Sequence, residues 1–339
     1  MAQRITEFML KLSKDLKDKK NVTESTADAY IRTLVLLNNK APFKNLLFIK
    51  KIEDVLPKLS DYAISTRKNI IATIASVLSL YKDSPTYKKA YEAYSAKLKE
   101  FQSEQTQERG DTLEKTEKEE ENWIEWSEVE KVRNELKEQV NSFKDNKNIT
   151  TAQYDVLLSY LILCLFTYVQ PRRNQDYQAM FVVRQWTDKM PTDKNYLDLH
   201  GQRFIFNVYK TAKSGGQQVI EIPDSDDVPL KDAIVSYLKH NAHYKASKNK
   251  ATEFRFLTKA DGTPLTAVNA ITRILNRLFG RKIGSSMLRH SFLSNKYGSV
   301  VEEMKEDAGA MAHSMGTQKT YIRAPKDGKI ELNESIDAE

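Results

Sequence analysis

Cysteine is almost absent from this chain, because Cys164 is the one cysteine among 339 residues. A single cysteine excludes an internal disulfide framework and any cysteine-rich zinc site. It lies in the apolar run 160–166, which predicts a buried core thiol, since a nucleophilic cysteine needs a polar, cationic setting. The lack of disulfides also suits a reducing compartment.

Long apolar runs and the common cofactor motifs are missing as well. No segment reaches the roughly 18 apolar residues that span a bilayer, and the N-terminal segment lacks the apolar core of a secretory signal. We therefore expect an intracellular protein without a membrane partner. The chain has five histidines and no Walker loop, dinucleotide-binding glycine pattern or HExxH motif, so we expect no cofactor and no metal site.

Size and charge admit a nucleic-acid partner without requiring one. A chain of 339 residues fits two domains, and a hydrophobic fraction of 40% provides enough apolar material for their cores. Lysine and arginine number 53 against 46 acidic residues, which gives a net charge of +7 and a pI near 9.1. This excess suits a polyanion such as nucleic acid or an anionic membrane, and it equally fits a soluble basic protein.

The first hundred residues are predicted to form a basic helical domain, residues 1–101. They contain 19 basic and 11 acidic residues, a net charge of +8, so the bundle could lie along DNA phosphates or simply be solvated. Ser65 is a candidate cap for the fourth helix. Apolar periodicity predicts helices over 5–16, 27–37, 49–59, 66–81 and 87–101.

An acidic linker is predicted over 102–121, where eight acidic and three basic residues give a net charge of −5 and almost no side chain is apolar. A second domain follows over 122–325, with a polar tail over 326–339. Period-two alternation predicts strands around 197–199, 203–209 and 218–222, the last two forming a hairpin. The fold class is mainly α with a small antiparallel β-sheet (α+β). Helices are predicted over 128–136, 151–167, 230–240, 267–279, 286–297 and 301–312.

Four segments of the second domain carry side chains suited to phosphate chemistry. In chain order they supply an arginine, a lysine pair, a second arginine and finally a histidine with a tyrosine. Each segment alone is a common pattern, but the order is unusual in a basic chain. The residues are Arg173 with Asp176, Lys210 with Lys213, Arg289 with Ser286 and His290, and His313 with Tyr321.

This order resembles the tyrosine recombinase and integrase family. In that family an arginine stands three residues before an acidic residue, as Arg173 stands before Asp176. The family's His-x-x-Arg-His motif corresponds to the segment from Ser286 to His290. Its Gly-His-Ser motif, followed by Thr and Tyr, corresponds to 312–314 and 320–321. The resemblance to the catalytic domain covers about 122–325, and a weaker one relates 1–101 to the family's core-binding domain.

The resemblance implies a site-specific DNA recombinase or integrase that needs neither metal nor ATP. Its two domains would clamp double-stranded DNA, and a homo-tetramer would exchange strands through a Holliday junction. The first motif is similar to those of members carried by eukaryotic viruses and mobile elements. The compartment, whether nucleus, nucleoid or viral factory, stays open, as do the host, the accessory proteins, the target site and the choice between integration and excision or resolution.

The expected chemistry places two guanidinium groups around one phosphate. Arg173 and Arg289 would each offer several fixed donors to its oxygens and stabilise charge in the transition state. Their charge would also favour the phenolate of Tyr321, whose attack leaves a 3′-phosphotyrosyl bond. Lys210, or alternatively Lys213, would protonate the leaving 5′-oxygen, and His313 would donate a hydrogen bond to the phosphate.

The sequence departs from the family pattern at three points. These departures concern the catalytic efficiency and the exact geometry of the expected site, not the type of reaction. Ser286 replaces the first histidine of the second motif, although a serine still donates one hydrogen bond. Ala312 replaces the glycine before His313, and the interval from His313 to Tyr321 is one residue shorter than expected.

Ordinary structural roles compete with each assignment. Arg173 could form a helix-start salt bridge with Asp176, the two lysines could solubilise a turn, and Tyr321 is one of 16 tyrosines. We interpret His290 as structural.

Two other functions also remain open for the whole protein. One is a type IB topoisomerase-like enzyme acting as a monomer, and the other is a DNA-binding relative without catalytic activity.

Overall fold

The computed structural model describes residues 5–109, 114–223, 225, 227–246 and 253–322. The chain divides into two compact units, Met1–Thr112 and Leu113–Glu339. The division falls inside the stretch that was predicted to be a linker, although the first part of that stretch continues a helix as far as Arg109. Among the described residues, no helix is long and apolar enough to cross a bilayer.

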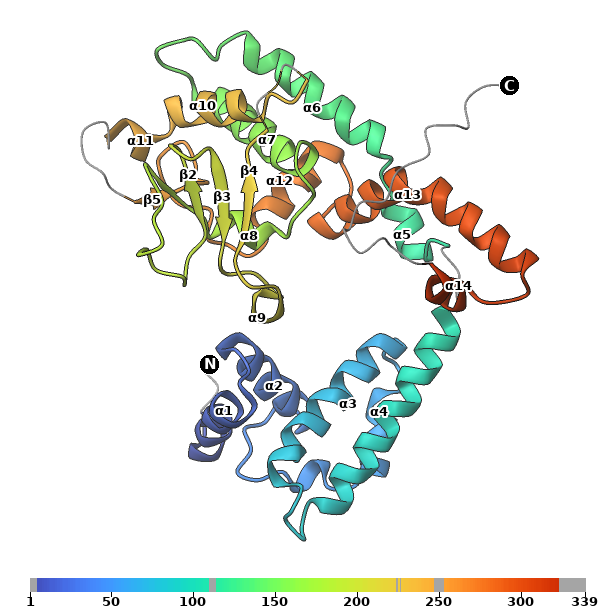
Figure 1. Cartoon of the computed structure of the whole chain (residues 1–339). Helices are drawn as coiled ribbons and strands as arrows, with labels where there is room; N and C mark the ends of the chain where they lie inside the picture. Colours follow the sequence, from blue (N-terminus) through green and yellow to red (C-terminus); the bar gives the residue numbers. More distant parts are fainter. Residues whose placement is uncertain (1–4, 110–113, 224, 226, 247–252, 323–339) are drawn as a thin grey trace. The chain divides into compact units, whose positions relative to one another are not determined.

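All regular elements among the described residues of the first unit are helices. Its longest helices, α3 and α4, lie side by side (Figure 1), and its core contains Leu12, Leu34 and Ile71, each 0% exposed. The elements are α1 (Glu7–Lys20), α2 (Glu24–Leu37), η1 (Leu47–Ile49), η2 (Ile52–Asp54), η3 (Leu56–Leu59), α3 (Ile64–Leu78), η4 (Ser79–Tyr81) and α4 (Lys88–Arg109).

Two local predictions for this unit are wrong. The segment 49–59 forms short 3-10 turns rather than an α-helix, and Pro57, which has no backbone N–H to donate, stands within it. Ser65 does not cap α3, because the helix begins earlier, at Ile64, with Ala63 in the cap position. Apolar spacing located the helix but not its first turn.

The sheet of the second unit is mixed, with strand order β4-β3-β2-β1-β5, so the prediction of an antiparallel sheet is wrong in part. The predicted hairpin is present as β3 paired antiparallel with β4. The two strands that sequence missed have three and two residues, too short for a period-two pattern, and one of them pairs parallel with β2. The strands are β1 (Phe181–Val183), β2 (Tyr196–Asp198), β3 (Arg203–Phe206), β4 (Gln218–Glu221) and β5 (Phe254–Arg255).

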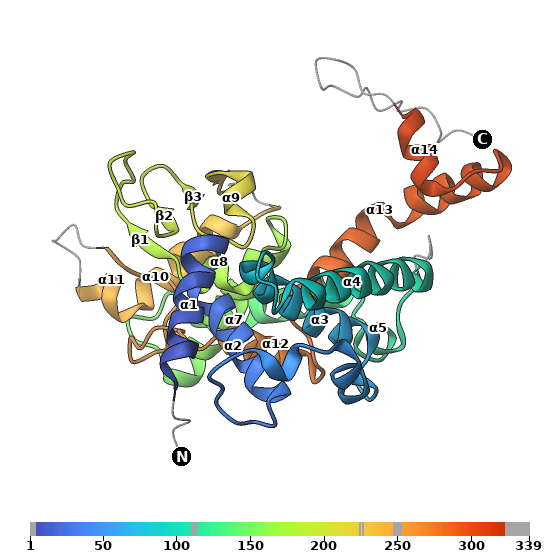
Figure 2. The same ribbon diagram turned by 90° about the horizontal axis from the view of Figure 1, so that it is seen from below.

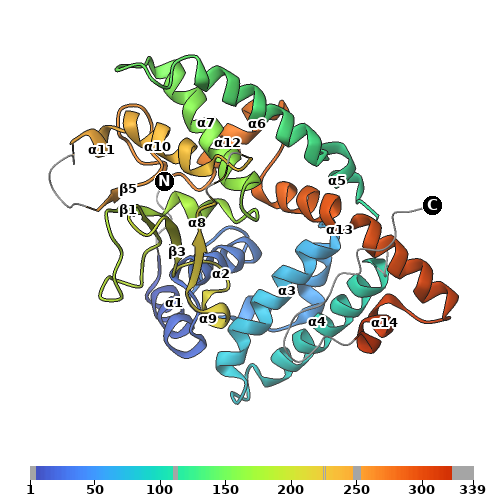
Figure 3. The same cartoon turned by 45° about the horizontal axis from the view of Figure 1, so that its top comes forward.

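Helix α7 (Thr151–Thr167) is the centre of this unit and lies between α6 and α10 (Figure 3). It contains Cys164, which is 0% exposed, and burial raises the pKa of its thiol to about 12, so the prediction of a buried core thiol is confirmed. The other helices are α5 (Glu117–Asn122), α6 (Trp126–Asn141), α8 (Asn174–Gln178), α9 (Ala212–Gly215), α10 (Leu230–His240), α11 (Ala242–Ala246), α12 (Ala270–Phe279), α13 (Ser285–Ala310) and α14 (Met315–Tyr321).

The two faces of the sheet pack differently. Val182, Leu197 and Phe204 join the core formed with the helices. On the opposite face of the sheet lies a separate small cluster. It consists of Val183, Tyr196 and Ile205, packed with Trp186 and Met190 from the loop after β1. Both faces of the sheet are therefore covered by packed side chains. This packing holds the base of the hairpin β3–β4 in place.

Helix α13 departs most from prediction. Two helices were expected, over 286–297 and 301–312, but the structure has one continuous helix of 26 residues. Its buried residues are Ser285, Leu288, Ser291 and Ala308, so its first turns pack firmly while its middle does not. Figures 1 and 2 draw α13 leaving the body of the unit, with α14 against its distal part.

Candidate active site

Two adjacent arginines precede α8, and their surroundings differ. Arg172 Nε donates to Asp176 Oδ2 over 3.0 Å, and Arg172 Nη1 donates to Gln218 Oε1 over 2.8 Å. The Arg172 guanidinium also lies 3.8 Å from the centre of the Phe206 ring. Arg173 makes no hydrogen bond or ion pair through its side chain with any other described residue. The salt bridge considered for Arg173 is therefore made by Arg172, and the Arg173 side chain remains available.

Arg289, in the second turn of α13, is close enough to Arg173 for their charges to interact. Its Nε donates to the carbonyl oxygen of Ser285 over 3.1 Å, a contact within the helix. Burial lowers the pKa of Arg289, the charge of Arg173 lowers it further, and the Asp176 carboxylate raises it. Two half-buried guanidinium groups that repel each other form a site that a bound anion would stabilise.

Asp176 lies with Arg172, Arg173 and Arg289 in one group and is 3% exposed. Burial raises the pKa of its carboxyl, while the charge and hydrogen bond of Arg172 and the charge of Arg173 lower it. Three arginines against one ionised carboxylate give this group a net charge of +2. The arrangement can therefore bind a phosphate, because one arginine neutralises the carboxylate and two positive charges remain.

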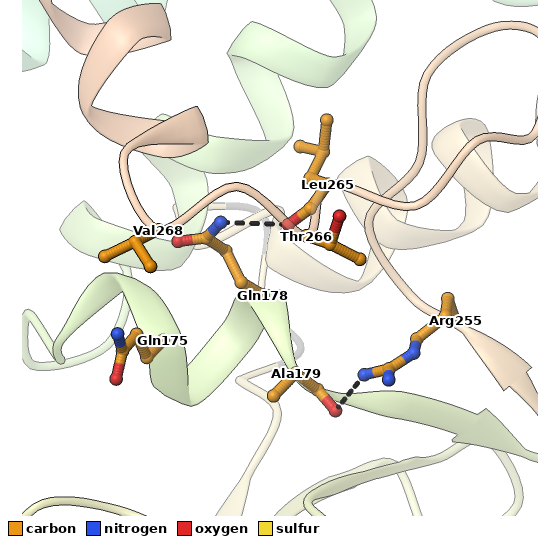
Figure 4. A pocket seen from close by; sticks show the side chains of 7 residues that line it. All are labelled: Gln175, Gln178, Ala179, Arg255, Leu265, Thr266 and Val268. Atoms are coloured by element: carbon orange, nitrogen blue, oxygen red, sulfur yellow. Dashed lines mark hydrogen bonds between the residues drawn. The ribbon is translucent and has the colours of Figure 1, made fainter. Parts of the chain in front are cut away.

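Contacts on the other side of α8 hold it in place. Gln178 Nε2 donates to the carbonyl oxygens of Leu265 and Ala267 over 2.9 and 2.7 Å, and Asn174 Nδ2 donates to Thr272 Oγ1 over 2.9 Å. An open pocket of about 280 Å³ lies beside these contacts (Figure 4). Its lining residues are Gln175, Gln178, Ala179, Arg255, Leu265, Thr266 and Val268. These bonds fix α8, and with it Arg173, against the segment that leads into α12.

The two lysines lie at the tip of the β3–β4 hairpin, as predicted, around the single helical turn α9. Both Lys210 and Lys213 are exposed. Arg172 connects this hairpin to α8, because it reaches Phe206 at the end of β3 and Gln218 at the start of β4. Arg172 therefore ties the base of the hairpin to the arginine group, while the two lysines belong to its exposed tip.

Ser286 and His290 lie near Arg289 on α13, and both are exposed. Ser286 is one turn before Arg289 and therefore shares its side of the helix. His290 Nδ1 lies 3.9 Å from a carboxylate oxygen of Glu119, which belongs to a capping box at the start of α5. This contact gives His290 a neighbour on another helix and agrees with a structural role.

His313 and Tyr321 form a second group, beyond the end of α13. Their ring centres are 5.6 Å apart, and His313 Nε2 lies 3.3 Å from Gln318 Oε1. They line an open pocket of about 420 Å³ together with Met311 and Ile322. Tyr321 is 69% exposed, so its hydroxyl is available to another molecule.

The two groups are far apart within the chain. Arg289 and Ala308 both belong to α13, and 19 residues at a rise of about 1.5 Å place them roughly 28 Å apart along its axis. The backbone N–H of His313 bonds to the carbonyl oxygen of Ala308 over 3.0 Å, which fixes the start of α14 at that end. The seven residues of α14 span about 10 Å, too little to return Tyr321 to Arg289. The structure therefore unites Arg173 with Arg289 but not with Tyr321 and His313.

Sequence reasoning missed the part played by Arg172. A signal was present, because Arg172 and Asp176 are four residues apart at the start of a helix, a spacing that favours an ion pair. The family spacing drew attention to Arg173 instead. Whether Arg172 or Arg173 pairs with Asp176 depends on the directions of the two side chains just before α8. The spacing of residues in the sequence does not specify these directions.

No group of three or more histidine, cysteine, aspartate or glutamate side chains suited to a metal ion occurs among the described residues. Comparison with protein-family models found no match to this chain. Comparisons with curated proteins and with solved structures also found none.

Proposed function

We propose that this protein is a tyrosine recombinase that cleaves and rejoins DNA through a 3′-phosphotyrosyl intermediate. The observation that carries the proposal is the pair of half-buried guanidinium groups, Arg173 and Arg289, which interact electrostatically while the nearby carboxylate is bonded to Arg172. A DNA phosphate has two non-bridging oxygens and needs positive charge when a nucleophile approaches. Two arginines that lack carboxylate partners fit that need.

In the proposed reaction the Tyr321 phenolate attacks the phosphorus and the bond to the 5′-oxygen breaks. The departing oxygen takes a proton from the Lys210 ammonium, or alternatively from that of Lys213, and His313 and Ser286 donate hydrogen bonds to the phosphate. Rejoining is the reverse, with a 5′-hydroxyl as the nucleophile and tyrosine as the leaving group. The covalent intermediate conserves the bond energy, so no ATP is consumed.

DNA is the proposed partner, and the charge of the first unit supports it. Residues 1–112 contain 20 basic and 14 acidic residues, a net charge of +6 out of the +7 of the whole chain. Such an excess favours binding to phosphates in general and weakens with added salt. Recognition of a specific site and assembly into a tetramer remain part of the proposal.

One observation favours a second candidate, a DNA-binding relative that lacks catalytic activity. Tyr321 lies on the distal side of α13, away from the arginine pair of its own chain. The same separation weighs against a monomeric topoisomerase-like enzyme, which would need all of these residues in one chain.

Covalent trapping tests the proposed function. The full-length protein is incubated with a pool of nicked DNA duplexes of random sequence, whose short cleaved strand diffuses away and prevents rejoining. Protein bound covalently to DNA is then isolated under denaturing conditions and sequenced. We expect an adduct from the wild type, none from Tyr321→Phe, and roughly a hundredfold less from Arg289→Ala.

Matched variants separate chemistry from folding. Tyr62 and Arg184 are also exposed, so Tyr62→Phe and Arg184→Ala should trap as much DNA as the wild type. If the wild type forms no adduct yet binds duplex DNA, the inactive relative is the correct interpretation. Relaxation of supercoiled plasmid without sequence preference would instead favour the topoisomerase-like enzyme.

A further inference from the structure

We propose that Arg281 and Glu128 are positioning residues, which hold the start of α13 where the guanidinium of Arg289 can reach the phosphate. This inference rests on the proposed function and adds two residues to it, because neither belongs to the four segments that indicated the reaction. Arg281 lies in the connection 280–284 between α12 and α13, and Glu128 lies in the first turn of α6.

The first argument is that the Arg289 side chain depends on the position of its own helix. Its one hydrogen bond among the described residues goes to the carbonyl oxygen of Ser285, which is also in α13. The charge of Arg173 repels Arg289 more strongly than the Asp176 carboxylate attracts it. This repulsion favours a shift of α13 away from Arg173, so contacts at the start of the helix must oppose that shift.

The second argument is that Arg281 ties the connection before α13 to the start of α6. Its Nη1 donates to the carbonyl oxygen of Trp123 over 2.5 Å, and its Nη2 donates to Glu128 Oε1 over 2.6 Å. The two partners bind different nitrogens of one planar group, so they fix both its place and its direction. Trp123 and Glu128 are 158 and 153 residues away from Arg281 in the chain, so these bonds join two distant segments.

Packing on both sides of Arg289 supports the same role. Ile283, in the same connection, is 0% exposed and belongs to the main core, and its backbone N–H donates to Asn276 Oδ1 over 2.8 Å. Trp126, at the start of α6, packs edge to face on Phe292 of α13, with ring centres 5.2 Å apart. The first turns of α13 are therefore held before and after Arg289, beside α5 and α6 (Figures 1 and 3).

The competing interpretation is an ordinary surface ion pair. The side chains of Arg281 and Glu128 are 37% and 39% exposed, and exposed pairs contribute little to stability. The second unit contains another pair of similar exposure, Lys194 with Glu253, at 32% and 29%. These two residues stand just before β2 and β5, so this pair joins segments of the sheet and provides a matched control.

The rate of covalent trapping at saturating DNA tests the proposal in the full-length protein. The substrate is a nicked duplex that the wild type has trapped, so a wild type without adducts ends both the proposed function and this inference. We expect Glu128→Ala and Arg281→Ala to form adducts about ten- to a hundredfold more slowly, the effect of a misplaced catalytic group, at an unchanged half-saturating DNA concentration. Glu128→Gln keeps the acceptor oxygen and should react nearly as fast as the wild type, and Glu253→Ala should react at the wild-type rate.

Dependence on Arg289 separates positioning from a general loss of structure. If Glu128 acts through Arg289, then Glu128→Ala should slow the wild type but cause no further slowing of Arg289→Ala, because the group that it positions is gone. Equal slowing in both backgrounds would overturn the inference, as would a wild-type rate in Glu128→Ala, and the proposed function would stand in either case. Tryptophan fluorescence in urea verifies that the second unit of each variant is folded.

Discussion

Arg172 connects three parts of the second unit through one side chain. It neutralises Asp176, bonds to Gln218 on β4 and stacks on Phe206 of β3. The carboxylate is almost fully buried, so its charge depends on this partner. Because Arg172 pairs with Asp176, the side chain of Arg173 keeps no carboxylate partner among the described residues, which the proposed phosphate binding requires.

Removing Arg172 should destabilise the second unit strongly. Arg172→Ala leaves a buried carboxylate without its main partner, which costs about 3–5 kcal/mol, and the loss should appear as an earlier transition in urea at neutral pH. Asp176→Asn in the Arg172→Ala background should recover part of this loss. A loss below about 1 kcal/mol, the range of a surface pair, would contradict the buried role of Arg172.

The same variant should change the pH dependence of stability. Burial already raises the pKa of Asp176, and Arg172 opposes that rise, so Arg172→Ala raises the pKa further. A carboxyl whose pKa is higher in the folded state binds more protons there, and the free energy of unfolding then increases as the pH falls through that pKa. Arg172→Ala should regain stability on acidification toward the ordinary aspartate value, and Arg172→Ala with Asp176→Asn should not.

At the level of single residues, the sequence indicated which arginines lie close together, but not which arginine pairs with the carboxylate. It identified Arg173 and Arg289, which the structure brings together, because their residue type and order limit the alternatives. It did not distinguish Arg172 from Arg173 as the partner of Asp176. That choice depends on how the chain enters α8 and on the position of Gln218, 46 residues away.

At the level of secondary structure, the apolar periodicity of the sequence predicted the positions of long helices well. It predicted poorly where a helix is interrupted. The predicted bounds of α7 and α10 agree with the structure, because both combine strong apolar spacing with clear ends. In α13 two helices were predicted, over 286–297 and 301–312, yet one helix continues through Gly298. Glycine makes a helix less stable without ending it, and what lies beside the helix decides the outcome.

Ala312 carries a local strain that a substitution can relieve. Its φ is +55°, a conformation that costs an L-residue about 1–2 kcal/mol and glycine much less. Ala312→Gly should therefore stabilise the junction between α13 and α14 by about 1 kcal/mol. The backbone amide of Gln318, bonded to Ser314, should then exchange its hydrogen about fivefold more slowly.

Ala310 provides the matched control for this change. It is the last residue of α13 and has no positive φ, so Ala310→Gly should weaken the same junction rather than strengthen it. Equal effects of the two glycines on exchange in α14 would show that the φ of Ala312 does not limit the stability of this segment.

At the level of the whole molecule, the two largest hydrophobic cores of the described residues share no residue. The core of the first unit draws its buried residues from Met9 to Phe101, and the main core of the second from Ile124 to Leu288. A core is the cooperative unit of folding, so two separate cores predict two unfolding transitions rather than one. The division between the two units falls within the acidic stretch 102–121, which has few apolar side chains that could join either core.

Tryptophan makes the two transitions distinguishable, because Trp123, Trp126 and Trp186 all belong to the second unit. Tryptophan fluorescence should report that unit alone, whereas circular dichroism should report the helices of both. Ile71→Ala and Leu161→Ala each empty a fully buried site and should cost about 2–5 kcal/mol in their own units. We expect Ile71→Ala to shift part of the dichroism curve in urea and leave the fluorescence curve unchanged, and Leu161→Ala to shift the fluorescence curve. Movement of both curves together in either variant would mean that the units fold as one, and the chain would then have a single cooperative core despite its two clusters.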